Sequence, residues 1–288
     1  VQEGILFQQH RNRISDGIYN QQVSLVVDGM MDEHNLARAF ERLVERHEAL
    51  RTCFAEDADG YQVQLVKEKA ILPIKWIDLP EDEADAKLEW AAVISDDECI
   101  PFDERRAPLS RLTVGRQGKR WHLLWSHHHA ILDGWSLPIL LNELELPEQE
   151  WAQLPPPVTR APFWKWLATQ RHPGRQRARS DAWRQRFAGM DHATLVGAQL
   201  GQGNDSTKNN RHKSHVNKDV CHRLRNFAQQ SGVTVAAIVQ AAFGMVLASL
   251  TYQRDLAIGV VQSGRPPEVI GANDWVGMFM NTLPLRIT

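Results

Sequence analysis

Residues 126–136 of this chain read Ser-His-His-His-Ala-Ile-Leu-Asp-Gly-Trp-Ser. The stretch follows a strand-like segment and precedes a helix-like segment, which predicts a loop whose side chains are presented by a rigid scaffold. Its core is the pattern His128-His129-x-x-x-Asp133-Gly134. With 12 His and 18 Gly in 288 residues, the expected number of chance matches to this pattern is on the order of 10⁻³. The pattern therefore indicates a functional site.

The residue types in this pattern suit proton transfer. A neutral imidazole with a pKa near 6.5 moves a proton or accepts a hydrogen bond at neutral pH better than other side chains do. A carboxylate at Asp133 would order the loop. Gly134 would permit a backbone conformation that other residues resist, or the close approach of a thin substrate.

Two other interpretations of the histidines are open. Three consecutive histidines would chelate a metal ion only if their rings converged, and neighbouring strand residues point to opposite faces, so no metal site is expected. The histidines could also be buried structural residues. The chain has no Gly-x-Ser-x-Gly elbow, no cysteine in a reactive context and no glycine-rich phosphate loop, which leaves little support for a covalent nucleophile. This favours direct transfer between two bound substrates that the protein aligns.

The segments around the pattern predict a mixed α/β chain with hairpins. Apolar residues recur at helical spacing in some segments and alternate with period two in others. The predicted helices are 31–46, 81–95, 136–146, 218–231 and 235–250, and the predicted strands are 50–54, 61–66, 109–114, 120–126, 256–262 and 278–287. Pro155-Pro156-Pro157 is stiff and places a boundary between two halves near residue 160. The polar segment 197–213 is predicted to be a loop.

Composition excludes several classes of protein. The chain has 33 Lys+Arg, 35 Asp+Glu and a formal net charge of -2, so neither nucleic acid nor an anionic membrane is an expected partner and any basic patch must be local. The longest apolar stretch, 233–250, is interrupted by polar residues and is too short to span a membrane, so a soluble chain is expected. The three cysteines are far apart, which predicts no disulfide framework and a reducing, cytoplasmic location. No leader peptide is visible, and the start without Met suggests a piece of something longer.

The pattern with its continuation, His128-His129-x-x-x-Asp133-Gly134-Trp135-Ser136, resembles the signature of condensation domains of nonribosomal peptide synthetases, in the chloramphenicol-acetyltransferase-like superfamily. The resemblance covers the whole chain, because further motifs of the family follow in order. They are Gln2-Glu3-Gly4-Ile5-Leu6-Phe7, Arg46-His47-Glu48-Ala49-Leu50-Arg51-Thr52-Cys53-Phe54, Phe102-Asp103, Ala107-Pro108-Leu109 with Arg111, Trp166 with Trp183-Arg184, Ser263-Gly264-Arg265-Pro266, and 276–286. The fourth motif departs from the family, because Arg160-Ala161-Pro162-Phe163 replaces a tyrosine-rich lead-in.

The resemblance implies a fold of two chloramphenicol-acetyltransferase-like lobes, 1–160 and 161–288, that form a V with a tunnel between them. Residues 1–160 carry the signature. The family continues beyond Arg286 for roughly another third of a domain, so the C-terminal lobe is expected to be incomplete and the isolated chain is not expected to be fully active.

The resemblance also implies the reaction, which is peptide-bond formation in antibiotic or other secondary-metabolite synthesis. Donor and acceptor carrier proteins would deliver phosphopantetheine arms, the domain would bind no cofactor of its own, and an adenylation domain would be a neighbour. His129 would orient or deprotonate the acceptor α-amino group, with His128 structural. Asp133, beside Gly134, would pair with an arginine, because a buried carboxylate needs such a partner. The candidate arginines are Arg46, Arg51 and Arg286, and the candidate tunnel residues are Trp135, Ser263 and Asn281.

Other functions of the same pattern remain open. An epimerisation domain shares the signature, but the continuation through Trp135 to Pro138 fits condensation better. A stand-alone acyltransferase would use a diffusible thioester such as coenzyme A. A non-catalytic docking platform for carrier proteins would need neither His129 nor Asp133. Within condensation domains, the opening motif and the residues leading into the signature resemble the subtype that takes a D-configured donor and an L-configured acceptor.

Overall fold

The computed structural model describes the chain except for residues 1, 13–16, 18, 30–31, 157–158 and 197–211. Its contacts divide the chain into two compact units. The first unit is Val1–Thr169 with Ser263–Asn281, and the second is Gln170–Gln262 with Thr282–Thr288. Ser263–Asn281 therefore packs with the first unit, although it follows the predicted boundary at residue 160 in sequence. The two predicted lobes, 1–160 and 161–288, stay a prediction.

The first unit is built on a four-stranded sheet with the strand order β1-β6-β5-β4. The strands are β1 (Asn20–Asp28), β4 (Ile74–Asp78), β5 (Ser110–Gln117) and β6 (Arg120–His128). β6 is central and antiparallel to both of its neighbours, with His128 opposite Asn20 of β1 and His127 opposite Ser110 of β5. β6 is buried from Trp121 to His128, so the histidines at its end are held by a buried part of the sheet.

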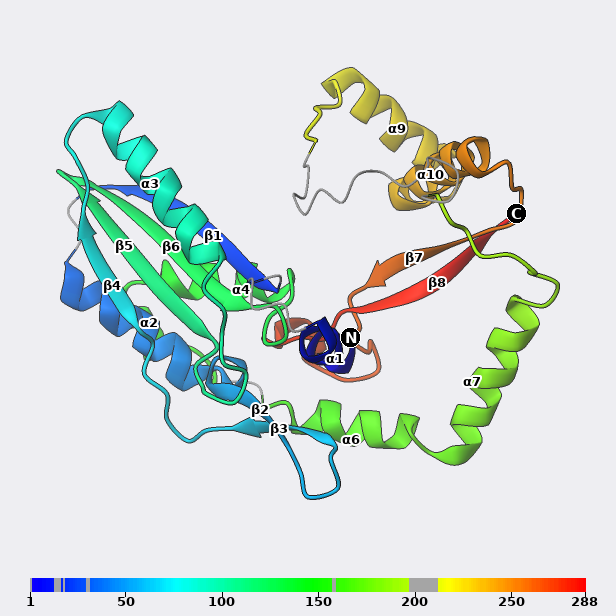
Figure 1. Ribbon diagram of the computed structural model, residues 1–288, viewed down its shortest axis with the longest axis horizontal. Helices are drawn as coiled ribbons and strands as arrows, with labels where there is room; N and C mark the ends of the chain where they lie inside the picture. The colour runs from blue at the N-terminus through cyan, green and yellow to red at the C-terminus, as the bar shows by residue number, and fades with distance from the viewer. Residues whose placement is uncertain (1, 13–16, 18, 30–31, 157–158, 197–211) are drawn as a thin grey trace. The chain divides into compact units, whose positions relative to one another are not determined.

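Helices α2 (Glu33–Arg46) and α3 (Glu83–Glu98) cover opposite faces of this sheet (Figure 1). The period of two along β6 sends alternate side chains to the two helices. Trp125 meets Phe40 of α2 edge to face, with ring centroids 5.3 Å apart, whereas the next residue, Ser126, donates a hydrogen bond to Asp97 of α3. The predicted helix 31–46 is confirmed, and it begins at Glu33 because the Asp32 carboxylate caps it by accepting from the His34 N–H (2.8 Å).

The first unit has further elements outside this sheet. They are α1 (Gln2–Asn12), η1 (Glu48–Arg51), β2 (Thr52–Glu56), β3 (Gln62–Val66), α4 (Ser136–Leu144), α5 (Glu148–Trp151), α6 (Ala161–Gln170) and η2 (Ala272–Asp274). β2 and β3 form the predicted hairpin, with Thr52 opposite Val66. The predicted strand 50–54 begins two residues late, because Leu50 and Arg51 belong to η1.

The second unit contains three helices and a two-stranded sheet within its described residues. They are α7 (Pro173–Arg186), α9 (Lys218–Gln230), α10 (Val235–Thr251), β7 (Leu256–Gln262) and β8 (Asn281–Ile287). The predicted helices 218–231 and 235–250 and the predicted strand 256–262 are confirmed. The predicted strand 278–287 begins later, at Asn281. Residues 197–211 of the predicted loop lie outside the described residues.

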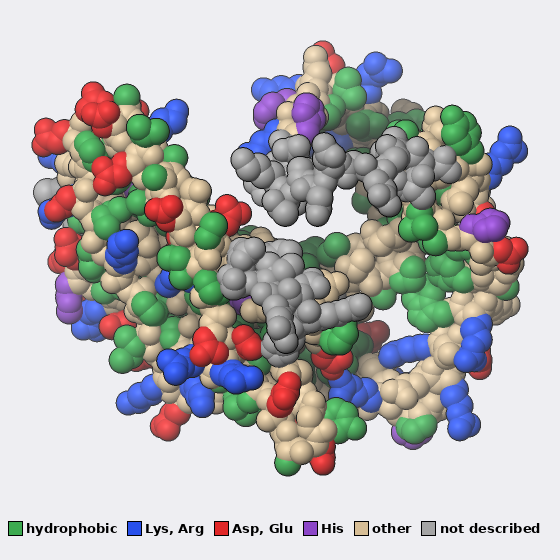
Figure 2. All heavy atoms as spheres, in the orientation of Figure 1, with side chains coloured by type: hydrophobic (Ala, Val, Ile, Leu, Met, Phe, Trp, Pro, Cys, Tyr) green, Lys and Arg blue, Asp and Glu red, His purple; other side chains and the backbone are tan. Residues whose placement is uncertain are grey.

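Charge is concentrated on one helix of the second unit. α7 contains five arginines, and its single carboxylate, Asp181, pairs with Arg184 at 2.9 Å. Figure 2 shows Lys and Arg side chains gathered at the lower right of the view, where Figure 1 places this helix. The near-neutral net charge predicts that any basic patch is local, and such a patch lies on α7.

None of the helices in the described ranges is by itself both long and apolar enough to cross a membrane. Helices α9 and α10 meet the length and composition criteria only when taken together, and the chain bends by 106° between them.

Candidate active site

The signature residues lie where β6 ends and α4 begins, within the first unit. β6 runs to His128, a turn carries His129 to Trp135, and α4 starts at Ser136. The turn is tied to the residue just before β1 through a backbone hydrogen bond from the His129 N–H to the Tyr19 carbonyl (2.8 Å). The strand and the helix therefore fix the two ends of the loop, as the sequence predicts.

His127 and His128 are buried and held neutral. Burial, with smaller effects of the neighbouring histidines, lowers the pKa of His127 to about 3. Burial also lowers the pKa of His128 to about 4, although Glu104 opposes this shift. Their side chains leave β6 on opposite faces, since the His127 ring contacts Trp125 and the His128 ring contacts Phe102. These two imidazoles do not converge on a common point.

Hydrogen bonds define the tautomer of His128. Its Nδ1 atom accepts from the Ala130 N–H (3.2 Å), so in the neutral ring the proton must reside on Nε2. Nε2 then donates to Oε1 of Gln9 on α1 (2.9 Å). Both nitrogens of His128 are therefore occupied within the protein. The structural role of His128 stays a prediction.

His129 has the opposite arrangement. Its Nδ1 atom lies 3.2 Å from the Leu132 carbonyl oxygen, which can only accept, so Nδ1 carries the proton. The neutral ring then has its lone pair on Nε2, which makes no hydrogen bond to the described part of the chain. His129 is only half-buried. Nδ1 of His127 also lacks a hydrogen-bond partner in the described part of the chain, but that side chain is buried. Of the three histidines, His129 therefore combines an unbonded nitrogen with a partly exposed ring that can meet a bound group.

Asp133 is fully enclosed by donors. Its side chain is 2% exposed or less, and its two oxygens accept from both terminal nitrogens of Arg265, at 2.7 and 3.0 Å. The Ser136 hydroxyl (2.8 Å) and the backbone N–H groups of Ser136 (3.0 Å) and Phe279 (3.1 Å) complete the set. Such a bidentate, charge-assisted arrangement offsets the cost of burying the carboxylate. Asp133 therefore joins the start of α4 to the segment 265–279 and orders the loop, with no part exposed to a substrate.

The arginine that pairs with Asp133 was not among those predicted, so that prediction is wrong for all three. Arg46 pairs with Glu143 (3.0 Å), which also binds His47 at 2.7 Å. Arg51 donates to backbone carbonyls, among them those of Val44 (3.0 Å) and Glu68 (3.1 Å). Arg286 pairs with Asp255 at 2.6 Å. Each of these arginines has a nearer acceptor on its own or a neighbouring element.

Arg265 reaches Asp133 because of the glycine before it. Gly264 has a positive φ of 66°, and a Cβ atom at this position would lie 1.7 Å from the Phe279 carbonyl oxygen. Only glycine fits there. The guanidinium also donates to the Trp275 carbonyl (2.9 Å) and lies 4.8 Å above the Phe279 ring. The Ser-Gly-Arg-Pro motif in the sequence was the one signal that could have identified this partner.

Gly134 and Trp135 lie on the exposed side of the loop. Gly134 does not have a positive φ, and a Cβ atom there would meet nothing within 4 Å. The backbone conformation therefore does not require glycine. Of the two reasons predicted for Gly134, the close approach of a thin substrate remains. Trp135 is 48% exposed. Ser263 accepts a long hydrogen bond from the Arg265 N–H (3.5 Å), and Asn281 begins β8 with its side chain exposed.

A polar network between β6 and α3 fixes the strand that carries the histidines. Asp97 of α3 accepts from Ser126, from Arg111 (2.6 Å) and from Gln22 (2.9 Å). Burial alone would raise the pKa of Asp97, but the hydrogen bonds from Arg111 and Ser126 outweigh it and hold the pKa below its usual value. The carboxylate thus ties β1, β5 and β6 to α3.

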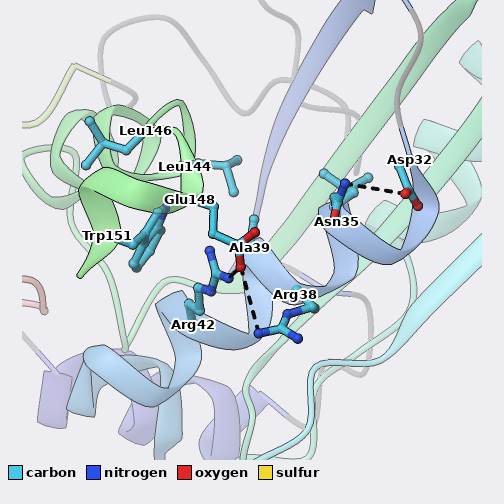
Figure 3. Close-up of a pocket in the computed structure, with 10 residues that line it drawn as sticks. Asp32, Asn35, Arg38, Ala39, Arg42, Leu144, Leu146, Glu148 and Trp151 are labelled. Atoms are coloured by element: carbon cyan, nitrogen blue, oxygen red, sulfur yellow. Dashed lines mark hydrogen bonds and ion pairs between the residues drawn. The ribbon is translucent and has the colours of Figure 1, made fainter.

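A separate cavity of about 380 Å³ lies between α2 and the α4–α5 segment (Figure 3). Arg38 and Arg42 of α2 project from one side, and both meet Glu148 from the other, with Arg38 at 4.0 Å. Trp151 and Leu144 supply the apolar surface. None of the signature residues lines this cavity, so it is not part of the histidine site.

We expect the free energy of unfolding to fall as the pH is lowered from about 6.5 to about 4. His127 and His128 resist protonation in the folded chain, whereas in the unfolded chain they protonate near pH 6.5, so acid favours unfolding. For His128, a folded-state pKa of about 4 corresponds to a loss of about 3 kcal/mol across this interval. Urea denaturation at several pH values measures it. His128→Gln should make the profile less steep, with the contribution of His127 remaining, and His34→Gln, at an exposed position, should not. A flat wild-type profile would contradict the burial argument.

Comparisons with known proteins identify the family to which the chain is similar. The family model of the condensation domain matches residues 1–288. Gramicidin S synthase 2 of Brevibacillus brevis is 29% identical over all of this chain and 6% of its own length. Bacitracin synthase 3 of Bacillus licheniformis is 28% identical over all of this chain and 5% of its own length. The chain thus spans less than a tenth of either relative.

Solved structures share the fold. The first condensation domain of the calcium-dependent antibiotic synthetase, in complex with a substrate analogue, superposes with a TM-score of 0.75 at 22% identity over 99% of this chain and 67% of that one. A four-domain nonribosomal peptide synthetase gives a TM-score of 0.75 at 20% identity over 99% of this chain and 22% of that one. The predicted mixed α/β fold of the chloramphenicol-acetyltransferase type is confirmed.

Proposed function

The chain belongs to the condensation-domain family, and from that premise we propose that it catalyses peptide-bond formation in nonribosomal peptide synthesis. The acceptor α-amino nitrogen would attack the carbonyl carbon of the donor thioester. The new C–N bond forms as the C–S bond breaks, the nitrogen loses one proton, and the departing thiolate takes up one proton. The two substrates would arrive on phosphopantetheine arms of donor and acceptor carrier proteins, and an adenylation domain would be a neighbour in the modular chain.

The observation that supports this proposal most directly is the tautomer of His129. The Leu132 carbonyl holds the proton on Nδ1, so Nε2 presents its lone pair to whatever enters beside the loop. A free α-amino group has a pKa of about 7.7–8.0, so a useful fraction is neutral near pH 7. We propose that Nε2 accepts a hydrogen bond from this amine, orients its lone pair toward the thioester, and takes the proton as the bond forms.

The surrounding groups support one imidazole acting alone. His128 has both ring nitrogens occupied, and Asp133 is saturated by Arg265 and backbone donors. An epimerase would need a base on each side of the α-carbon, and neither of these groups is free to be the second one. A docking platform would need no ordered His129. The geometry therefore favours acyl transfer to an amine.

A single-turnover assay tests the proposal. A donor aminoacyl-carrier protein and an acceptor aminoacyl-carrier protein are mixed with the full-length parent domain, and intact-protein mass spectrometry follows the acceptor. We expect a dipeptidyl mass on the acceptor carrier. If the proposed subtype is correct, more of this product forms from a D-configured donor than from its L-isomer. If carrier proteins bind but no donor is transferred, the docking-platform function replaces this one. Transfer from coenzyme A thioesters without carriers would favour a stand-alone acyltransferase.

A further inference from the structure

The first helix, α1, presents two glutamines to the loop that carries His129. Gln2, Ile5, Leu6 and Gln9 follow the spacing i, i+3, i+4, i+7, so they share one face of the helix. Ile5 and Leu6, at 7% and 1% exposure, bury the middle of this face in the core. The glutamines at its two ends are only partly buried. The apolar pair thus anchors the helix and leaves one polar group on either side, two turns apart.

Gln9 accepts a hydrogen bond from the residue before His129. Its Oε1 atom lies 2.9 Å from Nε2 of His128. This contact fixes the proton on Nε2 and keeps Nδ1 available as the acceptor for the Ala130 N–H (3.2 Å). The His128 ring therefore bridges α1 and the turn, and the bridge requires an acceptor at position 9.

Gln2 donates a hydrogen bond to the residue after His129. Its Nε2 atom lies 2.8 Å from the Ala130 carbonyl oxygen. A carbonyl oxygen only accepts, so this contact requires a donor at position 2. The two glutamines thus hold His128 and Ala130, the immediate neighbours of His129, through hydrogen bonds of opposite direction.

We propose that Gln2 and Gln9 are positioning residues for His129, acting as a two-point clamp on the turn between β6 and α4. The inference rests on the proposed function, since it assumes that His129 acts on the acceptor amine. Neither glutamine contacts His129 itself. The clamp holds the His128 ring, which accepts from the Ala130 N–H, and the Ala130 carbonyl. It thereby restrains the turn on both sides of His129 and the direction of its Nε2 lone pair, and a misplacement of about 1 Å in such a group costs up to about a hundredfold in rate.

The opposite hydrogen-bond directions provide a test by isosteric substitution. Gln9→Glu keeps an acceptor for His128, so we expect kcat to stay within about twofold of wild type. Gln2→Glu replaces the donor by a carboxylate that faces a carbonyl oxygen, so we expect kcat to fall by about tenfold or more, with KM for both carrier proteins unchanged. Gln9→Leu should behave like Gln2→Glu, and Gln2→Lys, which restores a donor, should recover most of the rate.

The matched control is Gln8→Leu. Gln8 lies on the same helix and also accepts a hydrogen bond, but from the Tyr19 hydroxyl outside the turn. Gln8→Leu should leave kcat within about twofold of wild type. All variants should melt within about 4 °C of wild type, because each change removes at most a single hydrogen bond. Equal losses of kcat in Gln8→Leu and Gln9→Leu, or wild-type kcat in both Gln2→Glu and Gln9→Leu, would overturn the clamp.

A spectroscopic readout separates this proposal from the proposed function. In the ¹⁵N-histidine-labelled chain, the His128 ring should keep the Nε2–H tautomer in every variant, because the Ala130 N–H still donates to Nδ1. The Nε2–H resonance should be that of a hydrogen-bonded proton in wild type, Gln8→Leu and Gln9→Glu, and should move upfield in Gln9→Leu, which lacks the acceptor. If the wild-type chain transfers no donor, the proposed function fails while this resonance still tests the clamp. An unchanged Nε2–H resonance in Gln9→Leu would overturn the inference even in an active protein.

Discussion

Arg265→Met is expected to lower the free energy of unfolding by about 3–5 kcal/mol, because it leaves the Asp133 carboxylate buried without its counter-charge. In the wild type the two side chains are 2% and 0% exposed, with oxygen–nitrogen distances down to 2.7 Å. Ser136 and the Phe279 N–H would still donate to the carboxylate, but neither carries a positive charge. The loop and the segment 265–279 should separate first, since this ion pair joins them. Urea denaturation at neutral pH, followed by tryptophan fluorescence, measures the loss.

Two variants control for this interpretation. Arg116→Met removes a guanidinium that pairs with Asp78 at 2.6 Å, but these side chains are 50% and 75% exposed, so it should cost less than about 1 kcal/mol. The double variant Asp133→Leu/Arg265→Met should be more stable than the sum of the two single losses predicts, because no charge is then left unpaired. A loss below about 1 kcal/mol for Arg265→Met would show that the pair does not hold the loop.

His129→Ala is expected to lower the single-turnover rate by about 10²–10⁴-fold, the range for removal of a general acid or base. The hydrogen bond from Nδ1 to the Leu132 carbonyl is lost with the ring, but no buried charge is left unpaired. Stability should therefore change little, and binding of both carrier proteins should persist. Intact-protein mass spectrometry of the acceptor carrier, with time points from a rapid-quench instrument, measures the rate.

His129→Gln separates hydrogen bonding from proton transfer. The amide can accept a hydrogen bond from the amine but takes up no proton. If orientation of the amine dominates, His129→Gln should retain more activity than His129→Ala, and raising the pH toward 8 should increase the rate of both as more amine becomes neutral. Undiminished transfer by His129→Ala, with the wild-type melting temperature, would remove His129 from the mechanism.

The sequence identified the site because its pattern is local. His128, His129, Asp133 and Gly134 lie within seven positions of one another, and strand and helix periodicity on either side predicts the loop that presents them. The same local rules predicted α2, α9 and α10 within two residues at each end. Strand β1 was not predicted, because Asn20, Gln21 and Gln22 at its start are polar. The side chains of Asn20 and Gln22 are accommodated by hydrogen bonds to α3 and to the loop after it.

The partner of Asp133 shows where sequence reasoning failed. The need for a positive charge was correct, since a buried carboxylate requires one. The choice among arginines was wrong, because Arg46, Arg51 and Arg286 each bind acceptors that lie closer in the fold. Arg265 is 132 residues from Asp133 in sequence. It reaches the carboxylate through a glycine turn that no periodicity predicts.

By itself, the sequence determined the family, the α/β class, the loop and the histidine that we propose carries the chemistry, because these depend on spacing along a few residues. The tertiary structure decided which arginine neutralises Asp133, which nitrogen of His129 is free, and that α1 holds the turn through Gln2 and Gln9. The sequence does not distinguish among the many arginines and glutamines, or between the two tautomers of a histidine. The free nitrogen of His129 follows from how the turn folds back on the Leu132 carbonyl. The partners of Asp133, His128 and Ala130 come from segments more than a hundred residues away, so only the packing of the whole unit could select them.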